Sequence, residues 1–407
     1  MFIIKKIKQF LTCINILFNK PKSSPCIIYG CESIYKKKTI EIISTVTTPL
    51  YLEAGKYYIN FYRIFLVIID FINISLKEKK KNKMDTYSLA LKTALLSQTV
   101  KTYNPKVIFT FLDNDIIFQN TALNMKGIKF FCIQNGARGF YDIKTVTNLK
   151  LINFFCFGLY DIKFLSDNGY YANRWLPVGN LLTSYFIKNV QQDFKKKYHI
   201  CLISQWRKSF YQDNYNCIYQ SYRKSIDGLV LSLNKFRLLN KNLKICIALC
   251  SYDFEEYDFY NNIFSENCII YKRDNNYEWT SYEAIAMSHI TVSVSSSMLS
   301  EAIALQSTPL GYNSSGDPFC NASLPESFIC KNEGEFIDKL NYYLSPENKN
   351  NSLEKYIYGN GDNLSKIYAF EVIQTAVKIA VEESSQNFED YLNKFSIKPT
   401  DLCELKL

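Results

Sequence analysis

The sequence has few of the residues that build metal sites. Its 407 residues include two histidines, His199 and His289, and the 13 cysteines form no Cys-x-x-Cys pair. Structural zinc sites need such ligands at short spacing, so we expect no metal ion and no cofactor. The cysteines are odd in number and lie mostly in apolar runs, as Cys132 does in FFCIQ. Free thiols of this kind indicate a reducing compartment, which predicts a cytoplasmic protein.

Two phosphate-binding fingerprints are also missing, and glycine is scarce, with 14 residues. Neither Gly-x-Gly-x-x-Gly nor Gly-x-x-x-x-Gly-Lys-Ser/Thr occurs, which argues against a dinucleotide-binding protein and against a P-loop hydrolase. The 31 Tyr and 29 Phe accompany many Ile, Asn and Lys residues, a bias typical of an AT-rich genome. We therefore expect no nucleic acid partner.

No apolar run is long enough to cross a membrane. The first 18 residues mix lysine with a short apolar run, and the PKSSP segment that follows offers no signal-peptide cleavage site. Phe61–Leu76 is the most apolar stretch, but Arg63, Asp70 and Asn73 interrupt it well short of the length that a bilayer requires. We interpret it as a buried helix.

Positive charge is concentrated near the start of the chain. The net charge is +10, and residues 1–83 contain 15 Lys or Arg against 5 Asp or Glu, which gives the same excess. Clusters at Lys5 to Lys8, Lys36 to Lys38 and Lys77 to Lys83 lie beside apolar residues. Anionic lipids attract such segments, which predicts peripheral association of residues 1–83 with an anionic membrane surface on the cytoplasmic side. The alternative is a solvated basic surface.

From Lys101 onward, runs typical of strands and helices alternate at a spacing of roughly 20–25 residues. This pattern predicts an α/β fold with two Rossmann-like, doubly wound parallel-sheet domains that face one cleft. The first domain covers residues 1–187, the second 198–345, and a helical tail 346–407. The predicted strands are VIFTFL, IKFFCIQ, NFFCF, RWLPV, HICLIS, LKICIALC, NCIIYK and ITVSV, and the longest predicted helices are Asn216–Asn240 and Asn363–Glu382.

The segment from Tyr282 to Asn313 contains the strongest binding signal. A strand (Ile290–Val294) leads into Ser295, Ser296 and Ser297, and a helix follows from Met298. A serine loop that opens a helix after a parallel strand can bind an anion through its free donors. Glu301 lies one turn inside the helix, where its carboxylate could accept from a ribose diol. Alternatively, Ser297 only caps the helix and Glu301 only complements the helix dipole.

Polar residues follow the other predicted strands. Asp113 and Asp115 end one strand, and Gln134, Asn135, Gly136 and Arg138 end the next, while Ser204 and Arg207 follow the first strand of the second domain. Ligands of such sheets bind at the carboxyl ends of the strands, so these residues are candidates for one site. Asp113-Asn114-Asp115 could instead hold a divalent ion, as in single-domain sugar transferases, or Asp113 or Asn114 could simply cap the next helix.

These segments together carry a resemblance. VIFTFLDND, KFFCIQNGARG, FFCFG, WLPVGN, ICLISQWR and SYEAIAMSHITVSVSSSMLSEAIALQSTPLGYN resemble bacterial surface carbohydrate biosynthesis proteins, which are similar to two-domain glycosyltransferases of the GT-B architecture. The resemblance covers about residues 100–315 and leaves residues 1–100 unmatched. The chain departs from the pattern at Gln306, where a glycine usually ends the helix.

The resemblance implies a metal-independent transfer of sugar from a nucleotide-sugar donor to a lipid-linked or polysaccharide acceptor of the cell surface. Ser296, Ser297 and Glu301 would then hold the phosphates and the ribose of the donor. Asp113 or Asp115 is our candidate base, and Gln134, Asn135 and Arg138 would orient the donor or acceptor. The alternatives are a polyol-phosphate transferase, a sugar-nucleotide epimerase on the same scaffold, or a non-catalytic glycan assembly protein.

Overall fold

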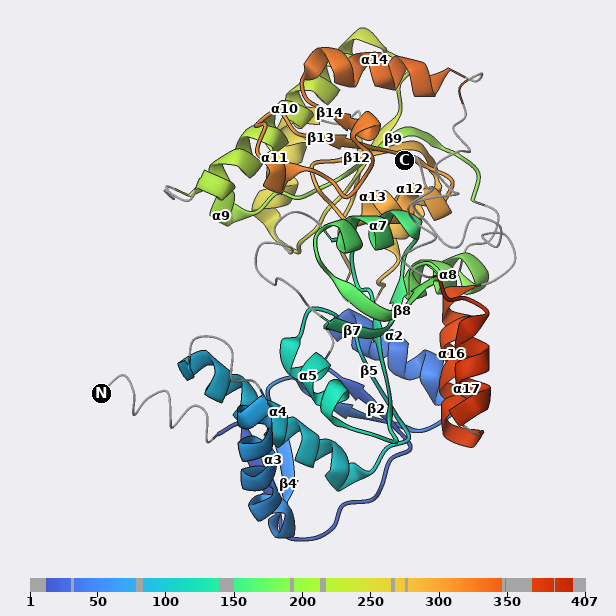
Figure 1. Ribbon diagram of the computed structural model, residues 1–407. Helices are drawn as coiled ribbons and strands as arrows, with labels where there is room; N and C mark the ends of the chain where they lie inside the picture. Colours follow the sequence, from blue (N-terminus) through green and yellow to red (C-terminus); the bar gives the residue numbers. More distant parts are fainter. Residues whose placement is uncertain are drawn as a thin grey trace.

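The computed structural model describes residues 12–30, 33–77, 83–138, 150–190, 194–212, 217–264, 268–274, 277–345, 348, 368–383 and 385–397. Within them, two six-stranded sheets stand one above the other (Figure 1). Every strand pairing in both sheets is parallel. This confirms the predicted α/β fold with two parallel-sheet domains.

The first sheet has the strand order β3-β2-β5-β6-β7-β8. Successive residues of its strands face opposite sides, so Ile27 and Ile108 join one apolar core while Ile28 and Phe109 join another. Helices cover both faces. The elements are β2 (Cys26–Tyr29), α2 (Ser33–Ser44), β3 (Pro49–Leu52), α4 (Lys83–Tyr103), β5 (Val107–Thr110), α5 (Ile116–Asn124), β6 (Lys129–Ile133), β7 (Lys150–Cys156), α7 (Leu159–Asp167), β8 (Tyr171–Pro177) and α8 (Leu181–Asn189).

The second sheet has the order β11-β10-β9-β12-β13-β14, the doubly wound order of nucleotide-binding folds. Its elements are β9 (Tyr198–Ile203), α9 (Lys208–Tyr211), α10 (Cys217–Leu239), β10 (Ile245–Ala248), α11 (Phe254–Phe264), β11 (Cys268–Tyr271), α12 (Thr280–Ala286), β12 (Ser288–Ser293), α13 (Met298–Ala304), β13 (Thr308–Tyr312), the 3₁₀ turns η3 (Pro318–Cys320) and η4 (Glu326–Phe328), β14 (Ile329–Cys330) and α14 (Glu333–Leu344). The eight predicted strands are all present.

The last described helices pack on the first domain. Helices α16 (Ala369–Glu382) and α17 (Ser385–Asn393) lie beside the first sheet, with α2 next to them (Figure 1). The apolar face of α16 joins the core formed by α2, β5 and α8, and Ile397 forms a bridge with Trp175 of β8. The predicted tail is therefore a structural part of the first domain.

An apolar junction joins the two domains. Trp279 and Tyr282, at α12, pack on Phe186 of α8 with ring centroids 5.4 Å from it in both cases. Tyr185 stacks on the other side of Trp279, and these residues belong to one continuous core with α16. Buried aromatic packing thus holds the two domains together.

A separate layer lies beside the first sheet. Strands β1 (Ile14–Leu17) and β4 (Tyr57–Asn60) pair in parallel, and η1 (Phe61–Arg63) leads into α3 (Ile64–Lys77), which packs on α4. The prediction that Phe61–Leu76 is a buried helix is wrong in part. Val67 and Ile74 are buried, but six apolar side chains on the other side of α3 are exposed: Phe65, Leu66, Ile68, Ile69, Ile72 and Leu76.

No helix in the described part of the chain has the length and apolar character needed to cross a membrane. The charged clusters around Lys5, Lys6, Lys8 and Lys77 to Lys83 lie mainly outside the residues whose side chains the structure describes.

We predict that Phe186→Ala lowers the free energy of unfolding by about 3–5 kcal/mol, because it leaves a cavity in the aromatic junction. Urea unfolding followed by circular dichroism measures the change. Leu239→Ala is the matched control, since Leu239 is 72% exposed and should shift the free energy by less than about 0.5 kcal/mol. Equal effects of the two substitutions would show that the junction contributes little.

Candidate functional site

The carboxyl ends of both sheets hold the predicted site residues. In the second sheet the strand order reverses between β9 and β12, and Ser204 to Arg207 and Ser295 to Ser297 follow these two strands. In the first sheet the order reverses between β2 and β5, and Asp113 follows β5. Such reversal points are where open α/β sheets bind ligands.

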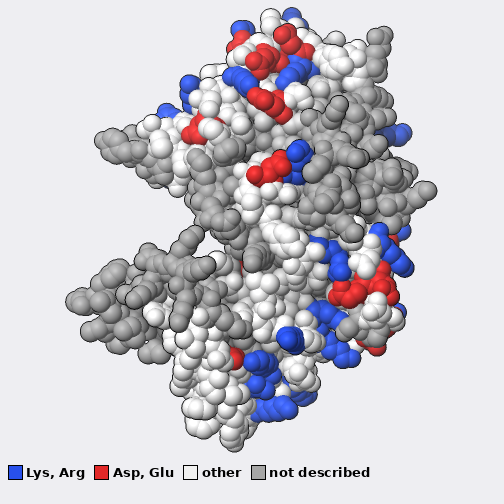
Figure 2. Space-filling view, in the orientation of Figure 1, with Lys and Arg blue, Asp and Glu red and all other residues white. Residues whose placement is uncertain are grey.

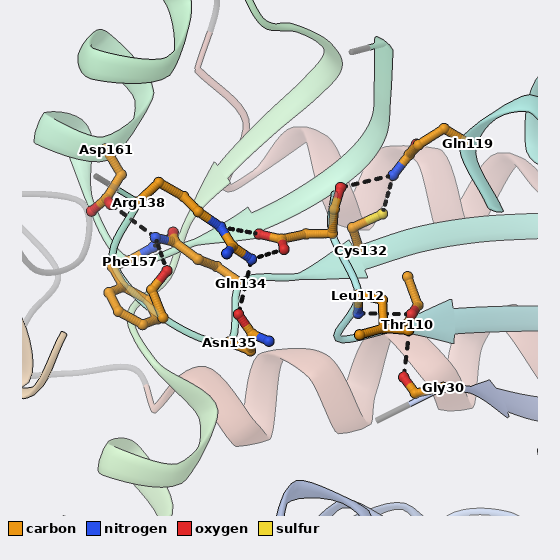
Figure 3. Close-up of polar contacts among 12 residues, drawn as sticks. Gly30, Thr110, Leu112, Gln119, Cys132, Gln134, Asn135, Arg138, Phe157 and Asp161 are labelled. Carbon is orange, nitrogen blue, oxygen red and sulfur yellow. Dashed lines mark hydrogen bonds and ion pairs between the residues drawn. The ribbon is translucent and has the colours of Figure 1, made fainter. Parts of the chain in front are cut away.

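Glycine is required at the reversal point of the first sheet. Gly30 ends β2 with φ +49°, and a Cβ atom there would lie 2.6 Å from Cδ1 of Leu112. The Gly30 carbonyl also accepts a bond from Thr110 Oγ1 at 3.4 Å, and Thr110 Oγ1 accepts from the amide of Leu112 at 2.8 Å. Figure 3 shows these contacts of Gly30, Thr110 and Leu112. They fix the turn that precedes Asp113 in the chain.

An ion pair forms the centre of the first-domain site. Asp113, 4% exposed, binds Arg138, whose Nε lies 3.2 Å from Asp113 Oδ2 and whose Nη2 donates to Oδ1. Nη2 also donates to Oδ1 of Asn135 at 2.9 Å. In Figure 3, Arg138 extends from the loop after β6 between these two partners. The two-point contact fixes the plane of the guanidinium group, which remains 14% exposed.

Gln134 is buried and has three partners. Its Nε2 donates to Asp161 Oδ1 at 2.8 Å and to the Gly136 carbonyl at 3.0 Å, and its Oε1 accepts from the Phe157 amide at 2.9 Å. Burial raises the pKa of the Asp161 carboxyl to about 7, although the Gln134 bond and the Arg138 charge act to lower it. Gln134 therefore positions the loop, and Asp161 is a buried group that can change charge near neutral pH.

The serine loop of the second domain is held from two sides. Gln205 Oε1 accepts from the Ser295 amide at 2.6 Å and from Ser293 Oγ at 3.2 Å, which links β9 to β12 across the reversal point. Tyr222 of α10 places its hydroxyl 2.9 Å from Ser295 Oγ. Ser296 and Ser297 are partly exposed. The loop is rigid at its base and offers hydroxyl groups at its tip.

The helix after this loop differs from the prediction. It contains seven residues, Met298–Ala304, so its dipole is small. Ser297 stands at the N-cap position but makes no capping bond through its side chain; Ser296 Oγ accepts from the Met298 amide instead, at 3.3 Å. Any anion held at this loop would depend on hydroxyl and amide donors and on nearby cations more than on the helix.

The two edges meet at Gly136. A Cβ atom built on Gly136 would lie 3.5 Å from Cβ and 3.6 Å from Oγ of Ser297, which is ordinary van der Waals contact. Gly136 lies next to Asn135 and two residues before Arg138. The loop that holds the Asp113–Arg138 pair therefore approaches the serine loop closely enough for one ligand to reach both.

Glu301 lies deeper than the sequence suggested. It is 2% exposed, and its Oε2 accepts from Thr183 Oγ1 of α8 at 2.5 Å and from the Tyr282 hydroxyl at 2.8 Å. Burial raises the pKa of the Glu301 carboxyl, and the two hydroxyl donors lower it in part. Glu301 thus connects the two domains, and its contact with a ribose stays a prediction.

Three further candidates have local partners. Asp115 caps α5 by accepting from the amides of Ile117 and Phe118 at 2.8 and 3.3 Å, a role that the sequence had suggested for Asp113 or Asn114. Burial raises the pKa of the Asp115 carboxyl. Ser204 donates to Glu256, which is fully buried. Arg207 precedes α9 and is exposed. Their roles in catalysis or donor binding stay predictions.

Gln306 keeps the conformation that the missing glycine would adopt. Its φ is +58°, in the left-handed region that glycine occupies at helix ends. Lys196 donates to the Gln306 carbonyl at 2.8 Å and to the Ser288 carbonyl at 2.7 Å, and burial lowers the pKa of Lys196 to about 8. The departure from the family pattern therefore leaves the turn after α13 intact.

Two partners of the site residues, Asp161 and Thr183, were not predicted from the sequence. Asp161 falls three residues after Gly158, in the first turn of α7, and Thr183 falls in the first turn of α8 after its cap Asn180. Acidic and hydroxyl residues are common in first turns for local reasons. Only the folded chain shows that these two face Gln134 and Glu301. In the described residues, no group of three or more His, Cys, Asp or Glu is placed to hold a metal ion.

Solved structures share this fold, although no protein-family model and no curated protein matches the sequence. S. aureus MnaA solved with UDP is 13% identical, with 88% of this chain and 98% of that chain covered and a TM-score of 0.51. A Listeria monocytogenes protein proposed to be a UDP-N-acetylglucosamine 2-epimerase is 11% identical, with 90% and 98% covered and a TM-score of 0.53. A glycosyltransferase from Rickettsia africae ESF-5 is 14% identical, with 92% and 96% covered and a TM-score of 0.43. The first two establish the GT-B-like, two-domain architecture.

We predict opposite stability effects for two substitutions of Glu301. Glu301→Ala leaves the hydroxyls of Thr183 and Tyr282 without an acceptor and should lower the free energy of unfolding by about 1–3 kcal/mol. Glu301→Gln keeps an acceptor and removes the buried charge. Because the folded pKa of Glu301 is raised, the wild type should lose stability as pH rises from about 4.5 toward that pKa. The free energy of unfolding of the Gln variant should therefore rise relative to that of the wild type over this pH range.

Urea unfolding of the three proteins at a series of pH values measures both effects. A difference between the Gln variant and the wild type that does not change with pH would show that Glu301 has an ordinary pKa in the folded protein. An Ala variant as stable as the wild type would show that the carboxylate does not hold the domains together.

Proposed function

We propose that this chain is an enzyme that acts on a nucleotide sugar bound between its two sheets. The close approach of Gly136 to Ser297 supports this proposal most directly, because it brings the polar edges of both domains together. The phosphates would lie at the hydroxyls of Ser295 to Ser297, with Arg138 or Arg207 as the counter-charge. The sugar would then extend toward Asp113 and Asn135.

Inversion at a sugar carbon of a UDP-sugar is the reaction that we favour. Two structures that share the fold with a TM-score above 0.5 are a UDP complex of S. aureus MnaA and a protein proposed to be a UDP-N-acetylglucosamine 2-epimerase. Inversion needs a group that removes a proton from carbon and a group that returns one. Asp113 is the carboxylate at the site edge, and Asp161, with a pKa of about 7, lies behind Gln134.

Sugar transfer to a surface glycan is the second candidate. The residue that follows β6 is Gln134, whose amide cannot transfer protons, and Asp161 is 1% exposed. Asp113 is then the one carboxylate at the contact surface, and a single base is what transfer to an acceptor hydroxyl requires. The polysaccharide or lipid-linked acceptor and the polyol-phosphate alternative remain predictions from the sequence.

Incubation with UDP-N-acetylglucosamine alone in D₂O separates these candidates. Inversion breaks and remakes a C–H bond, so NMR should show a second UDP-sugar that carries deuterium at the inverted carbon, without any acceptor. Transfer would release UDP only after a lipid-linked acceptor is added. If UDP and UDP-N-acetylglucosamine both fail to raise the melting temperature, the proposed nucleotide-sugar site is wrong.

We predict that Asp113→Asn lowers kcat at least about 100-fold, because an amide cannot take the proton that a general base accepts. The substitution keeps a partner for Arg138, so the fold should survive, as circular dichroism can verify. Asp167→Asn is the matched control, because Asp167 is exposed on α7 and pairs with Lys163. Turnover of the Asp113 variant at the level of the control would remove Asp113 from the mechanism.

We also predict that EDTA leaves turnover unchanged. Both oxygens of Asp113 bind Arg138, and Asp115 is engaged as the cap of α5, so the two carboxylates are not free to hold an ion together. The assay compares turnover with EDTA and with added Mg²⁺ or Mn²⁺. Loss of activity in EDTA that either ion restores would favour the metal-dependent alternative.

A further inference from the structure

Exposed apolar side chains gather on one small part of the molecule. Among the described residues, 22 large hydrophobic side chains are exposed, and ten of these belong to the segment from β1 to α3. Phe18 stacks on Phe61 with 5.8 Å between ring centroids, so the strand and helix share one surface. We call this surface the α3 face, and it consists of Ile16, Phe18, Phe61, Tyr62, Phe65, Leu66, Ile68, Ile69, Ile72 and Leu76.

The helix itself is apolar on two sides. Ile64, Val67, Phe71 and Ile74 recur at helical spacing and pack in the core against α4. Phe65, Ile68, Ile72 and Leu76 follow the same spacing on the outer side; Phe65 is 69% exposed and Leu76 is 58% exposed. A helix at the surface of a water-soluble domain normally has polar residues there. A contiguous apolar face of this kind indicates an interaction surface.

Cations border the α3 face. Arg63, Lys101, Lys106 and Lys126 line a hollow of about 450 Å³ that also includes Asn104 and Gly127. The acidic residue on α3, Asp70, is already bound by Lys101 at 3.1 Å and by Gln98 at 2.6 Å. Figure 2 shows the uncharged surface at the lower left, where Figure 1 places α3, with a group of Lys and Arg side chains beside it.

We propose that the α3 face docks on an anionic lipid surface, with its apolar side chains among the acyl chains and its cations at the headgroup phosphates. An interfacial helix places its apolar side about 5–10 Å below the headgroups and gains from nearby basic residues. A second copy of the chain would need a self-complementary face, and among the described residues this face offers cations while the acidic Asp70 is already paired. The charge pattern therefore favours lipid.

This docking does not depend on the proposed reaction. Lys126 and Gly127 of the basic hollow lie just before β6, whereas Asn135 of the site follows the end of β6. The five residues of β6 separate them by roughly 16 Å. The basic hollow and the candidate site therefore lie at opposite ends of the strands of the first sheet. Changes on the α3 face should leave nucleotide binding intact.

Vesicle co-sedimentation of the full chain tests the proposal. Vesicles of phosphatidylcholine mixed with phosphatidylglycerol are compared with vesicles of pure phosphatidylcholine, each at low and physiological salt. The Phe65→Ser/Ile72→Ser double variant should partition at least about tenfold less onto anionic vesicles, because two apolar side chains no longer leave water. The Leu238→Ser/Leu239→Ser double variant is the control, since both leucines are exposed on α10 of the second domain.

A second pair of variants tests whether the cations beside the α3 face contribute to vesicle binding. Lys126→Glu should weaken anionic vesicle binding about fivefold or more, whereas Lys241→Glu, at an exposed position of the second domain, should leave it unchanged. Stabilisation by UDP should be the same in all four variants, which keeps this test separate from that of the proposed function.

Three outcomes would overturn the proposal. The Phe65/Ile72 variant could sediment like its control, or binding to pure phosphatidylcholine could equal binding to the anionic vesicles. Light scattering could also show that the wild type forms a dimer that the Phe65/Ile72 variant loses, which would assign the α3 face to a second copy of the chain.

Discussion

The buried carboxylate of Glu301 is the contact on which the arrangement of the two domains depends. A charge with 2% exposure is tolerated only where donors replace water, and here the donors are Thr183 of the first domain and Tyr282 of the second. The aromatic packing around Trp279 supplies attraction without direction, whereas the hydrogen bond from Thr183 specifies how α13 sits on α8. Ser297, at the start of α13, is brought to Gly136 as a result.

The two domains contribute different kinds of side chain to the candidate site. The first domain contributes the Asp113–Arg138 pair and the buried Asp161, whose proton affinity depends on Gln134 and Arg138. The second domain contributes hydroxyls and amides on a loop fixed by Gln205 and Tyr222. An incoming diphosphate would compete with Asp113 for Arg138. Binding of the substrate would in this way change the environment of the candidate base.

Local patterns predicted the elements, and distant contacts decided what their side chains do. The strand before Ser295 and the strand before Gln134 could be read from the sequence, because each is an apolar run of the kind that buried strands have. The inward direction of Glu301 could not, since it depends on Thr183, which lies 118 residues earlier. The exposed side of α3 was missed for a related reason: an apolar stretch predicts burial, whereas no element of the described residues covers Phe65, which is 69% exposed. Residues 1–100 carried no motif, yet they supply β2, α2 and Gly30.

The last helices have a consequence for the order of assembly. Strand β8 of the first domain ends at Pro177, whereas α16, which completes the core over α2 and β5, begins at Ala369. A ribosome that adds about 5–20 residues per second needs roughly 10–40 s to make the chain between them. Until then the first sheet lacks the cover that α16 provides, whereas the last strand of the second sheet ends at Cys330, before α16 is made. The domain whose strands are made first thus completes its core last.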